Sequence, residues 1–568
     1  MSQWDESYDL VIIGSGGGSM CAALKAKELG KRALIIEKQS KVGGSTGYSG
    51  GVWWVPNNAV MKRHGVDDSY ERARQYFDSV VTYEGPSTSV PRREAFLRTG
   101  PVIVDFLERK GMAFEYADGW SDYYDDRPGG EPRGRSLVAK LFDVKELGEW
   151  EGRLSRYRGA AMPANSNEFP TLFLLKRTWA GKRKAMQLGL RLLKQKVRGQ
   201  HVLGGGAAIQ GRMLQIALRE QLPIWTESPV EELIVEDGRV VGVAVRQGTQ
   251  LRRIQAHDGV LINTGGFSHN AEMRKRYQPQ PASAAWTNAN PGDTGEVIQA
   301  AMRLGAATDC MDEAWWVVTS LGPGETFPEG ARTPTGEPLP FMHHLDLSLP
   351  YSIMVDQDGE RFCNEAGSYM EIGQRMYQRQ AETGKAVPSW VVMDSRQRKF
   401  YPWGTAMPGQ VPQQWLDSGY MVKADTLEEL SSKCGIDTAG LLRTVKRFNQ
   451  FCIAGKDEDF ARGGKAFDRC HGDPTIKPNP NLGAIEQGPF YAVRMYPGDV
   501  GTAGGLVTDE YARVLREDGQ PIAGLYATGN ATAGVSGRAY PGAGTSIAAS
   551  FIFAYIAAAH SAGQEKIW

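Results

Sequence analysis

The chain has few cysteines, no long apolar run and no net charge, and each absence excludes a class of protein. Its six cysteines among 568 residues include no CxxC pair, and its eight histidines show no ligand spacing, so we expect no metal site. The lack of a run of about 18 apolar residues excludes a membrane-spanning helix. The 65 basic residues balance the 65 acidic ones, which argues against a nucleic-acid-binding protein.

The length of the chain and its first residues indicate the number of domains and the cellular location. A chain of 568 residues is too long for one compact core and suits two or three domains. Met1 leads almost directly into the first predicted strand, which leaves no room for a signal peptide. We therefore expect a cytoplasmic protein.

Residues 8–37 have the pattern of a dinucleotide-binding strand, turn, helix and strand. The apolar strand at 10–13 leads into a glycine-rich turn, and a second strand ends at Glu37. The first glycine allows a tight turn, and the second lets backbone N–H groups approach a pyrophosphate. Glu37, about 20 residues farther on, is placed to accept hydrogen bonds from a ribose. The expected contacts of this region are Gly14, Ser15, Gly16, Gly17, Gly18, Glu37 and Lys38.

A second glycine-rich loop follows at residues 41–51. It is built almost entirely from glycine and hydroxyl residues, which indicates backbone that approaches a large flat or phosphorylated ligand. A flexible linker fits poorly, since Trp53 and Trp54 come immediately after it. The expected contacts are Gly43, Gly44, Ser45, Gly50 and Gly51.

The remaining chain divides by composition. Residues 231–267 read as a β-meander with hairpin turns at Asp237-Gly238 and Gln247-Gly248. Residues 287–486 are richer in proline and less regular, and we interpret them as a separate domain. The tail then returns to the pattern of strand, turn and helix.

Five motifs in this order resemble the fumarate reductase/succinate dehydrogenase flavoprotein superfamily. They are the first turn with Glu37, the 43–51 loop, residues 263–267, residues 292–296, and residues 501–505 followed by 524–530. The resemblance implies an α/β fold, in which a Rossmann-like FAD-binding domain (1–286 and 487–568) carries an inserted α+β catalytic cap domain (287–486). It also implies FAD contacts at Val230, Gly265, Gly529, Asn530, Gly544, Thr545 and Ser546. Members with covalent flavin have a histidine beside the second loop, and none lies in residues 38–63, so the FAD is expected to be non-covalent.

Within that superfamily, the chain is most similar to the 3-ketosteroid Δ1-dehydrogenases. Residues 540–544, Tyr-Pro-Gly-Ala-Gly, resemble their closing motif, and Val500-Gly501 replace the histidine of fumarate reductases. Residues 121–123, Ser-Asp-Tyr before Pro-Gly-Gly, and Asn364-Glu365 followed by Tyr369 also match. Trp120 departs from the pattern, because a tyrosine often stands there, and a supporting hydrogen bond is then in doubt.

The resemblance assigns roles in the oxidation of a 3-oxo-4-ene steroid to the 1,4-diene. Tyr369 takes the proton from carbon 2, and Tyr123 stabilises its phenolate. The Tyr540 hydroxyl and the Gly544 N–H polarise the ketone as an oxyanion hole, while hydride passes from carbon 1 to flavin N5. Alternatives are a 3-ketosteroid Δ4-(5α)-dehydrogenase, another enone or fumarate-reductase-like flavin oxidoreductase, and, in a different class, an electron-transfer subunit.

Residues 169–199 do not follow from the flavin pattern. They carry nine lysines and arginines and no acid, along an apolar stripe with helical spacing. This composition is typical of a helix that rests on an anionic membrane surface, although an ordinary surface helix with a basic face is the alternative. Gly181 and Gly189 weaken a long helix. The expected partners are therefore a 3-ketosteroid, an electron acceptor for which a quinone is one candidate, and the inner face of a membrane.

Overall fold

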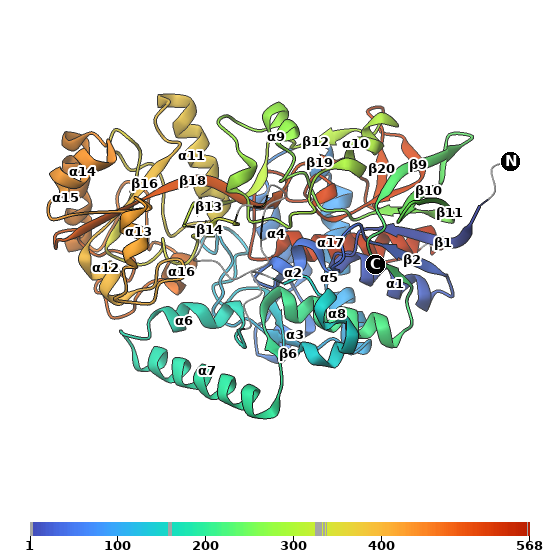
Figure 1. Cartoon of the computed structure of the whole chain (residues 1–568), viewed down its shortest axis with the longest axis horizontal. Helices are drawn as coiled ribbons and strands as arrows, with labels where there is room; N and C mark the ends of the chain where they lie inside the picture. Colours follow the sequence, from blue (N-terminus) through green and yellow to red (C-terminus); the bar gives the residue numbers. More distant parts are fainter. Residues whose placement is uncertain (1–3, 157–161, 324–331, 333–335, 337, 565) are drawn as a thin grey trace.

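Two large sheets lie at opposite ends of an elongated molecule (Figure 1). This computed structural model describes residues 4–156, 162–323, 332, 336, 338–564 and 566–568. Both ends of the chain lie on the side of the first sheet. The cores of the two ends are separate apolar clusters, and aromatic residues fill the region between them.

The first sheet has a parallel centre, as the predicted dinucleotide-binding pattern requires. Its main path runs in the order β20-β21-β11-β1-β2-β8. The parallel strands are β1 (Glu6–Ile13), β2 (Ala33–Ile36), β8 (Ile224–Trp225), β11 (Gln250–Ile262) and β21 (Pro521–Ala527), with β20 (Arg513–Leu515) antiparallel at the edge. The crossover from β1 to β2 is α1 (Gly17–Glu28), which packs against the C-terminal helix α17 (Thr545–Ser561).

The predicted meander is confirmed as three antiparallel strands. β9 (Val230–Glu236) and β10 (Arg239–Gln247) extend the sheet from β11. Asp237 and Gly238 have φ of 49° and 76° in the first turn, the left-handed conformation that a tight hairpin needs. Gly248, with φ of 57°, serves the second turn.

Helices and short strands cover the first sheet and lead to the second. α5 continues through Pro101, and α8 covers α1. These elements are α2 (Gly44–Tyr48), β3 (Val52–Trp54), α3 (Ala59–Arg63), α4 (Tyr70–Val80), α5 (Val90–Arg109), β4 (Phe114–Tyr116), β5 (Ser136–Ala139), α8 (Gly205–Arg219), α9 (Ala271–Tyr277) and α10 (Glu296–Arg303).

The second sheet is antiparallel and lies at the other end of the molecule. Its strands are β13 (Ala314–Ser320), β14 (Phe341–Met342), β15 (Ser352–Val355), β16 (Ser389–Met393), β17 (Met421–Ala424) and β18 (Phe490–Thr502). Helix α11 (Tyr369–Thr383) packs on β13, and α14 (Leu427–Cys434) and α15 (Thr438–Ala454) lie at the far end. The central strand β18 follows residue 486, so the pairing of this sheet extends beyond the range 287–486 that composition indicates.

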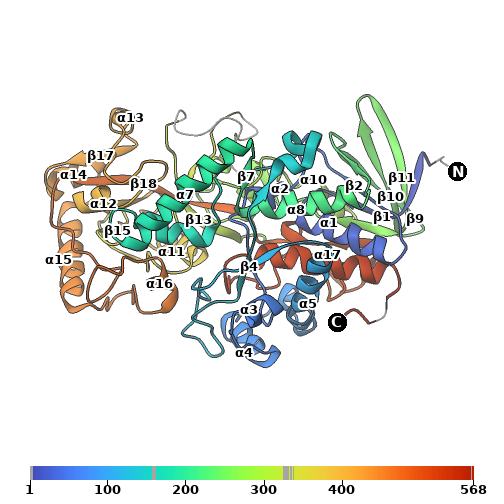
Figure 2. The same ribbon diagram turned by 90° about the horizontal axis from the view of Figure 1, so that it is seen from below.

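The basic segment forms α6 (Phe169–Phe173) and α7 (Trp179–Arg198). The Thr178 side chain accepts a hydrogen bond from the Gly181 N–H and begins α7, and Gly199 in the left-handed conformation ends it. Helix α7 runs along the outside of the molecule, as Figure 1 and Figure 2 both show. No helix in the described part of the chain is long and apolar enough to cross a membrane.

Candidate active site

A single large cavity connects the glycine-rich turn after β1 with the tyrosines predicted to react. Its volume is about 1290 Å³. Pockets for one small ligand have volumes of roughly 300–1,000 Å³, so this cavity has room for two ligands side by side. Its walls come from both sheets, from α2 and α8, and from α6 and α7.

The turn after β1 is shaped for the close approach of a phosphate. Gly14 has φ of 94°, and a Cβ there would lie 2.2 Å from the Asn263 carbonyl oxygen, so only glycine fits. Gly16 caps α1 with no side-chain hydrogen bond to the first turn. Ser19 donates its N–H to the Gly16 carbonyl (3.0 Å), and the N–H groups of Gly17 and Gly18 remain for an anion at the end of the cavity.

Glu37 is oriented by backbone and side chain. One carboxylate oxygen accepts from the Ser15 N–H (3.1 Å) and Oγ (2.6 Å), and the other accepts from the Gln39 N–H (2.8 Å). Burial raises the pKa of this carboxyl group. Glu37 still lines the cavity, and the oxygen that accepts from Gln39 keeps a lone pair for a ribose hydroxyl.

The structure brings most of the predicted cofactor contacts to this cavity. Those that line it are Gly14, Ser15, Gly16, Glu37, Lys38, Gly44, Ser45, Gly50, Gly51, Val230, Gly265, Gly529, Asn530, Gly544 and Ser546. Sequence reasoning missed Asn263 and Asp293, which also line it. The Ser45 hydroxyl donates to Asp293 (2.8 Å), and burial raises the pKa of this carboxyl group to about 7.

Four predicted contacts, Gly17, Gly18, Gly43 and Thr545, lie outside the lining. A Cβ on Gly17 would come within 2.0 Å of the Phe551 ring, and one on Gly18 within 2.5 Å of the Ser550 carbonyl oxygen. These two glycines let α1 pack closely on α17. Gly43 donates its N–H to Ser15 (3.0 Å), and the Thr545 hydroxyl donates to the Gly542 carbonyl (2.8 Å).

The polar groups of the cavity fit a dinucleotide. The buried hydroxyl of Thr264 lines the cavity and has no hydrogen-bond partner from the protein. Because buried polar groups are rarely left unpaired, it indicates a polar ligand beside the Gly14 turn. An unpaired donor, a bare helix N-terminus and an oriented carboxylate are what a pyrophosphate and a ribose need.

At the other end, the three predicted tyrosines meet. The ring centroids of Tyr123 and Tyr369 are 5.6 Å apart, those of Tyr369 and Tyr540 are 5.4 Å apart, and those of Tyr123 and Tyr540 are 5.7 Å apart. Tyr369 is the first residue of α11, Tyr123 lies between β4 and β5, and Tyr540 precedes α17. Three distant segments thus place three phenols around one part of the cavity.

Tyr540 and Gly544 form a pair of donors at the start of α17. The Gly544 N–H donates to the Tyr540 hydroxyl (3.2 Å), which also lies 3.0 Å from the Ser546 Oγ. Gly544 has φ of 86°, and a Cβ there would lie 1.7 Å from the Val52 carbonyl oxygen. The N–H and the hydroxyl are therefore close enough to bind one oxygen together.

Tyr369 rests as a neutral phenol. Burial raises its pKa well above the usual value, and the neighbouring Tyr123 and Tyr540 raise it further. The pKa of Tyr123 is also raised by burial. A base role for Tyr369 therefore requires a neighbour that accepts its own proton during the reaction.

His344 is a neighbour of Tyr369 that sequence reasoning missed. It lines the cavity, and its ring centroid lies 5.9 Å from that of Tyr369. Burial lowers its pKa to about 4, so the imidazole is neutral near pH 7. The adjacent His343 serves the core instead, since its ring nitrogens bond to Asp346 (2.7 Å) and Ser320 (2.7 Å). A histidine doublet in a sequence does not reveal which member faces a ligand.

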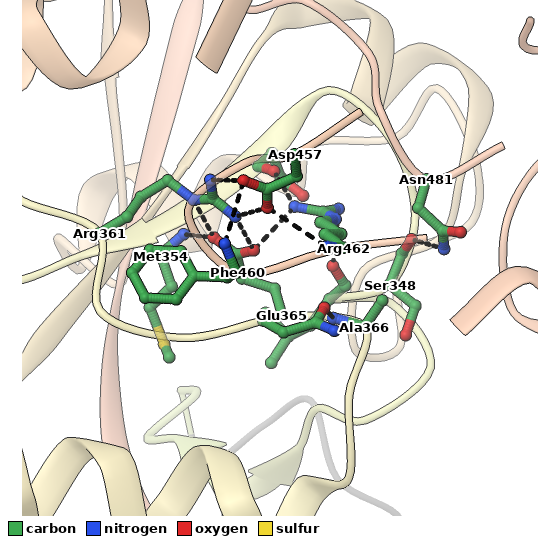
Figure 3. A network of polar contacts seen from close by, with 12 residues as sticks. Ser348, Met354, Arg361, Glu365, Ala366, Asp457, Phe460, Arg462 and Asn481 are labelled. Carbon is green, nitrogen blue, oxygen red and sulfur yellow. Dashed lines mark hydrogen bonds and ion pairs between the residues drawn. The ribbon is translucent and has the colours of Figure 1, made fainter. Parts of the chain in front are cut away.

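A buried network of charges holds the segment before Tyr369 (Figure 3). Glu365 accepts two hydrogen bonds from Arg361 (3.0 and 2.8 Å) and one from Arg462 (3.2 Å). The two arginines lower the pKa of this carboxyl group to about 2. Arg462 also donates to the carbonyls of Leu347 and Leu349, which lie just beyond His344. The network thus ties together the segments that carry Tyr369 and His344.

The arginine of the last motif is turned away from the cavity. Arg538 pairs with Asp312 (2.8 Å) and Glu313 (2.9 Å) and does not line the cavity. Val500, the residue in place of the fumarate reductase histidine, does line it. The closing motif therefore offers this cavity a phenol and a backbone N–H, with no guanidinium for a carboxylate.

Comparison with known proteins agrees with this geometry. The model of the FAD binding domain family matches residues 9–547. The chain belongs to this FAD-binding family. Its cofactor is FAD, which confirms the prediction from the glycine-rich motifs, and the α/β fold with a Rossmann-like FAD-binding region is confirmed as well.

Relatives in this family cover nearly the whole chain. The 3-oxosteroid 1-dehydrogenase of Mycolicibacterium smegmatis is 40% identical over 97% of each sequence. The 3-ketosteroid Δ1-dehydrogenase of Sterolibacterium denitrificans, solved with 1,4-androstadiene-3,17-dione, is 36% identical with a TM-score of 0.91, over 99% of this chain and 100% of that one. The 4-oxocyclohex-2-ene-1-carboxylate 5-dehydrogenase of Sinomonas cyclohexanicum is 34% identical over 96% of this chain and 92% of the relative. The resemblance stated from the motifs is confirmed.

Proposed function

We propose that this chain is an FAD-dependent 3-ketosteroid Δ1-dehydrogenase, which converts 3-oxo-4-ene steroids to 1,4-dienes. The main support for this proposal is that Tyr123, Tyr369 and Tyr540 lie together beside the Gly544 N–H, in a cavity that continues to the FAD-binding turn. The relatives that share the chain's full length and carry this activity in their names support it.

Each residue has a task in this reaction. Tyr540 and Gly544 donate to the ketone oxygen and make the carbon 2 proton more acidic. Tyr369 takes that proton as its own phenol proton passes to the neighbouring neutral imidazole of His344, and Tyr123 holds the Tyr369 oxygen in place. FAD held along the Gly14 turn and beside Glu37 would supply the oxidant, as acceptor of the hydride from carbon 1. The apolar walls exclude water from the reacting atoms.

Two other enzyme classes are weighed against this proposal. A cyclohexanone carboxylate dehydrogenase would need a cation for the carboxylate, and Arg538 is already neutralised by Asp312 and Glu313. A Δ4-(5α)-dehydrogenase could use the same phenol and N–H, so the product must separate the two.

The decisive experiment is anaerobic reduction of the flavin. Androst-4-ene-3,17-dione should bleach the flavin absorbance, with androsta-1,4-diene-3,17-dione as the product. Bleaching only by 5α-androstane-3,17-dione, with a 4-ene product, would identify the Δ4-(5α) enzyme instead. Bleaching by a cyclohexenone carboxylate and not by steroids would support the smaller substrate.

We also propose that α7 rests on an anionic membrane surface, so that the protein is peripheral to the inner face of the membrane. Trp179 is 83% exposed and Val197 78%, although both are apolar. Three of the nine bases are paired: Arg177 with Asp473, and Lys184 and Arg191 with Glu168. The other six form no ion pair among the described residues: Lys176, Lys182, Arg183, Lys194, Lys196 and Arg198. Each base near an anionic leaflet contributes about 1 kcal/mol.

Sedimentation with vesicles tests this surface. The protein should pellet with phosphatidylglycerol vesicles at low salt, bind less as salt rises, and bind phosphatidylcholine poorly. A protein that stays in the supernatant with anionic vesicles at low salt would have an ordinary solvated helix here. We propose a lipid-soluble quinone as the electron acceptor, because Ala185, Leu188 and Leu192 of α7 give the cavity an apolar wall.

A further inference from the structure

Helix α7 has two apolar sides with different surroundings. Ala185, Leu188, Gly189 and Leu192 line the cavity. Trp179, Met186, Leu190, Leu193 and Val197 are largely exposed to solvent. The helix is therefore a wall of the substrate cavity on one side and an open apolar surface on the other.

Little packing holds α7 in this position. Of its 20 residues only Gly181 is buried, where a Cβ would lie 2.4 Å from the Leu174 carbonyl oxygen. Figure 1 and Figure 2 show the helix running along the outside of the body. Elements with so few buried apolar contacts are the ones that open at low cost in free energy.

One carboxylate supplies the main polar attachment of α7. Glu168 accepts from Lys184 (3.0 Å) and from Arg191 (3.0 and 2.9 Å), two bases about two turns apart on one face of the helix. The Glu168 side chain is only 12% exposed, and it also accepts from the Asn165 N–H (3.0 Å). The same guanidinium of Arg191 donates to the Pro163 carbonyl (3.0 Å). Glu168 is thus fixed to the body and holds both bases.

We propose that α7 is a lid that Glu168 latches over the substrate cavity, and that an anionic lipid surface opens it by competing for Lys184 and Arg191. Lipid phosphates offer these bases an alternative anionic partner, while the exposed apolar side enters the interface. Opening then joins the apolar wall of the cavity to the lipid, and a membrane-dissolved steroid enters without crossing water. This inference rests on the proposed function, because it concerns access to the same cavity.

The test compares the wild-type protein with Glu168→Gln. The amide oxygen of glutamine can still accept from the Asn165 N–H, so the substitution removes the charge and keeps the local turn. In the absence of lipid, kcat/KM for androst-4-ene-3,17-dione should rise about fivefold, the shift expected from one moderate coupling. Phosphatidylglycerol vesicles should stimulate the wild type by a similar factor and the variant hardly at all. Trypsin cleavage after Lys182 and Arg183 should also accelerate in the variant, with no substrate present.

Glu108→Gln is the matched control, because it removes a partly buried carboxylate of α5 that pairs with Arg63 of α3 and makes no ion pair with α7. It should behave as the wild type in every assay. If Glu168→Gln does not fold, the double variant Lys184→Met/Arg191→Met breaks the same latch from the helix side and should show the same rise without lipid. Equal lipid-free activity and equal trypsin cleavage in latch variant and wild type would overturn the lid. Failure of the proposed function appears separately, as a wild-type flavin that androst-4-ene-3,17-dione does not bleach.

Discussion

Replacement of Tyr369 by phenylalanine isolates one hydroxyl among the three phenols. The ring keeps its contacts with Tyr123, Tyr540 and His344, at centroid distances of 5.6, 5.4 and 5.9 Å. Only the oxygen that is proposed to take the carbon 2 proton is lost. Steroid and FAD should therefore still bind, and flavin reduction should slow sharply.

The sizes of the two effects separate catalysis from packing. Loss of a positioned general base costs about 10²- to 10⁴-fold in rate, which is about 3 to 5 kcal/mol of transition-state stabilisation. Loss of one hydrogen bond in the fold costs about 1 kcal/mol of stability. Tyr369→Phe should thus lower the rate of flavin reduction strongly while it lowers the melting temperature only slightly.

Anaerobic stopped-flow measurement of flavin bleaching by androst-4-ene-3,17-dione gives the rate directly. Tyr377→Phe is the matched control, since Tyr377 lies on the same helix and its hydroxyl donates to the Pro281 carbonyl (3.2 Å) outside the cavity lining. It should keep the wild-type rate. A Tyr369→Phe protein that reduces its flavin within a few-fold of wild type would refute the base assignment. Exchange of the carbon 2 proton with solvent should fall in parallel with the rate.

Three further outcomes are expected. Tyr540→Phe should slow flavin reduction about 10²- to 10³-fold, because the Gly544 N–H alone then holds the ketone oxygen; a change in FAD content without a change in rate would make Tyr540 a packing residue. Acid precipitation should release all the yellow colour into the supernatant, since we predict a non-covalent flavin, and a yellow pellet would contradict this. Burial lowers the pKa of His471 to about 3 and that of His344 to about 4, below the usual value near 6.5. Their contribution to stability is therefore complete above about pH 6.5 and is lost as the pH falls toward 4. Between pH 7.5 and 4.5 the melting temperature should drop less steeply in His471→Phe than in the wild type. An unchanged slope would show that His471 does not contribute to the pH dependence of stability.

The glycine-rich motifs predicted the fold well because their spacing has few structural solutions. Gly14 and Gly16 lie at the turn where phosphate approach was expected. Gly17 and Gly18 belong to the same run of letters and serve helix packing instead. A sequence shows that a small residue is needed, but it does not show whether a ligand or Phe551 occupies the space.

The reactive end was predicted only where motifs marked it. Tyr123, Tyr369 and Tyr540 come together as their motifs indicated. His344 was missed because its role depends on the loop that turns it away from His343. The basic segment was read as free of acid, whereas Glu168, one residue before its start, pairs with two of its bases. Tertiary contacts of this kind leave no periodic pattern in the sequence, so they cannot be predicted from it.

Strand β18 determines where the substrate-binding parts of two such flavoproteins can be exchanged. It runs for 13 residues, or about 43 Å, from the centre of the second sheet to the FAD-binding region around the first sheet. At its far end the Thr502 hydroxyl accepts from the Phe267 N–H (3.3 Å), and Asp499 accepts from Ser268 (2.9 Å). A chimera that exchanges the substrate-binding part at residue 487 would therefore graft a sheet without its central strand. The splice should therefore lie after Thr502, so that the exchanged fragment includes its own central strand β18.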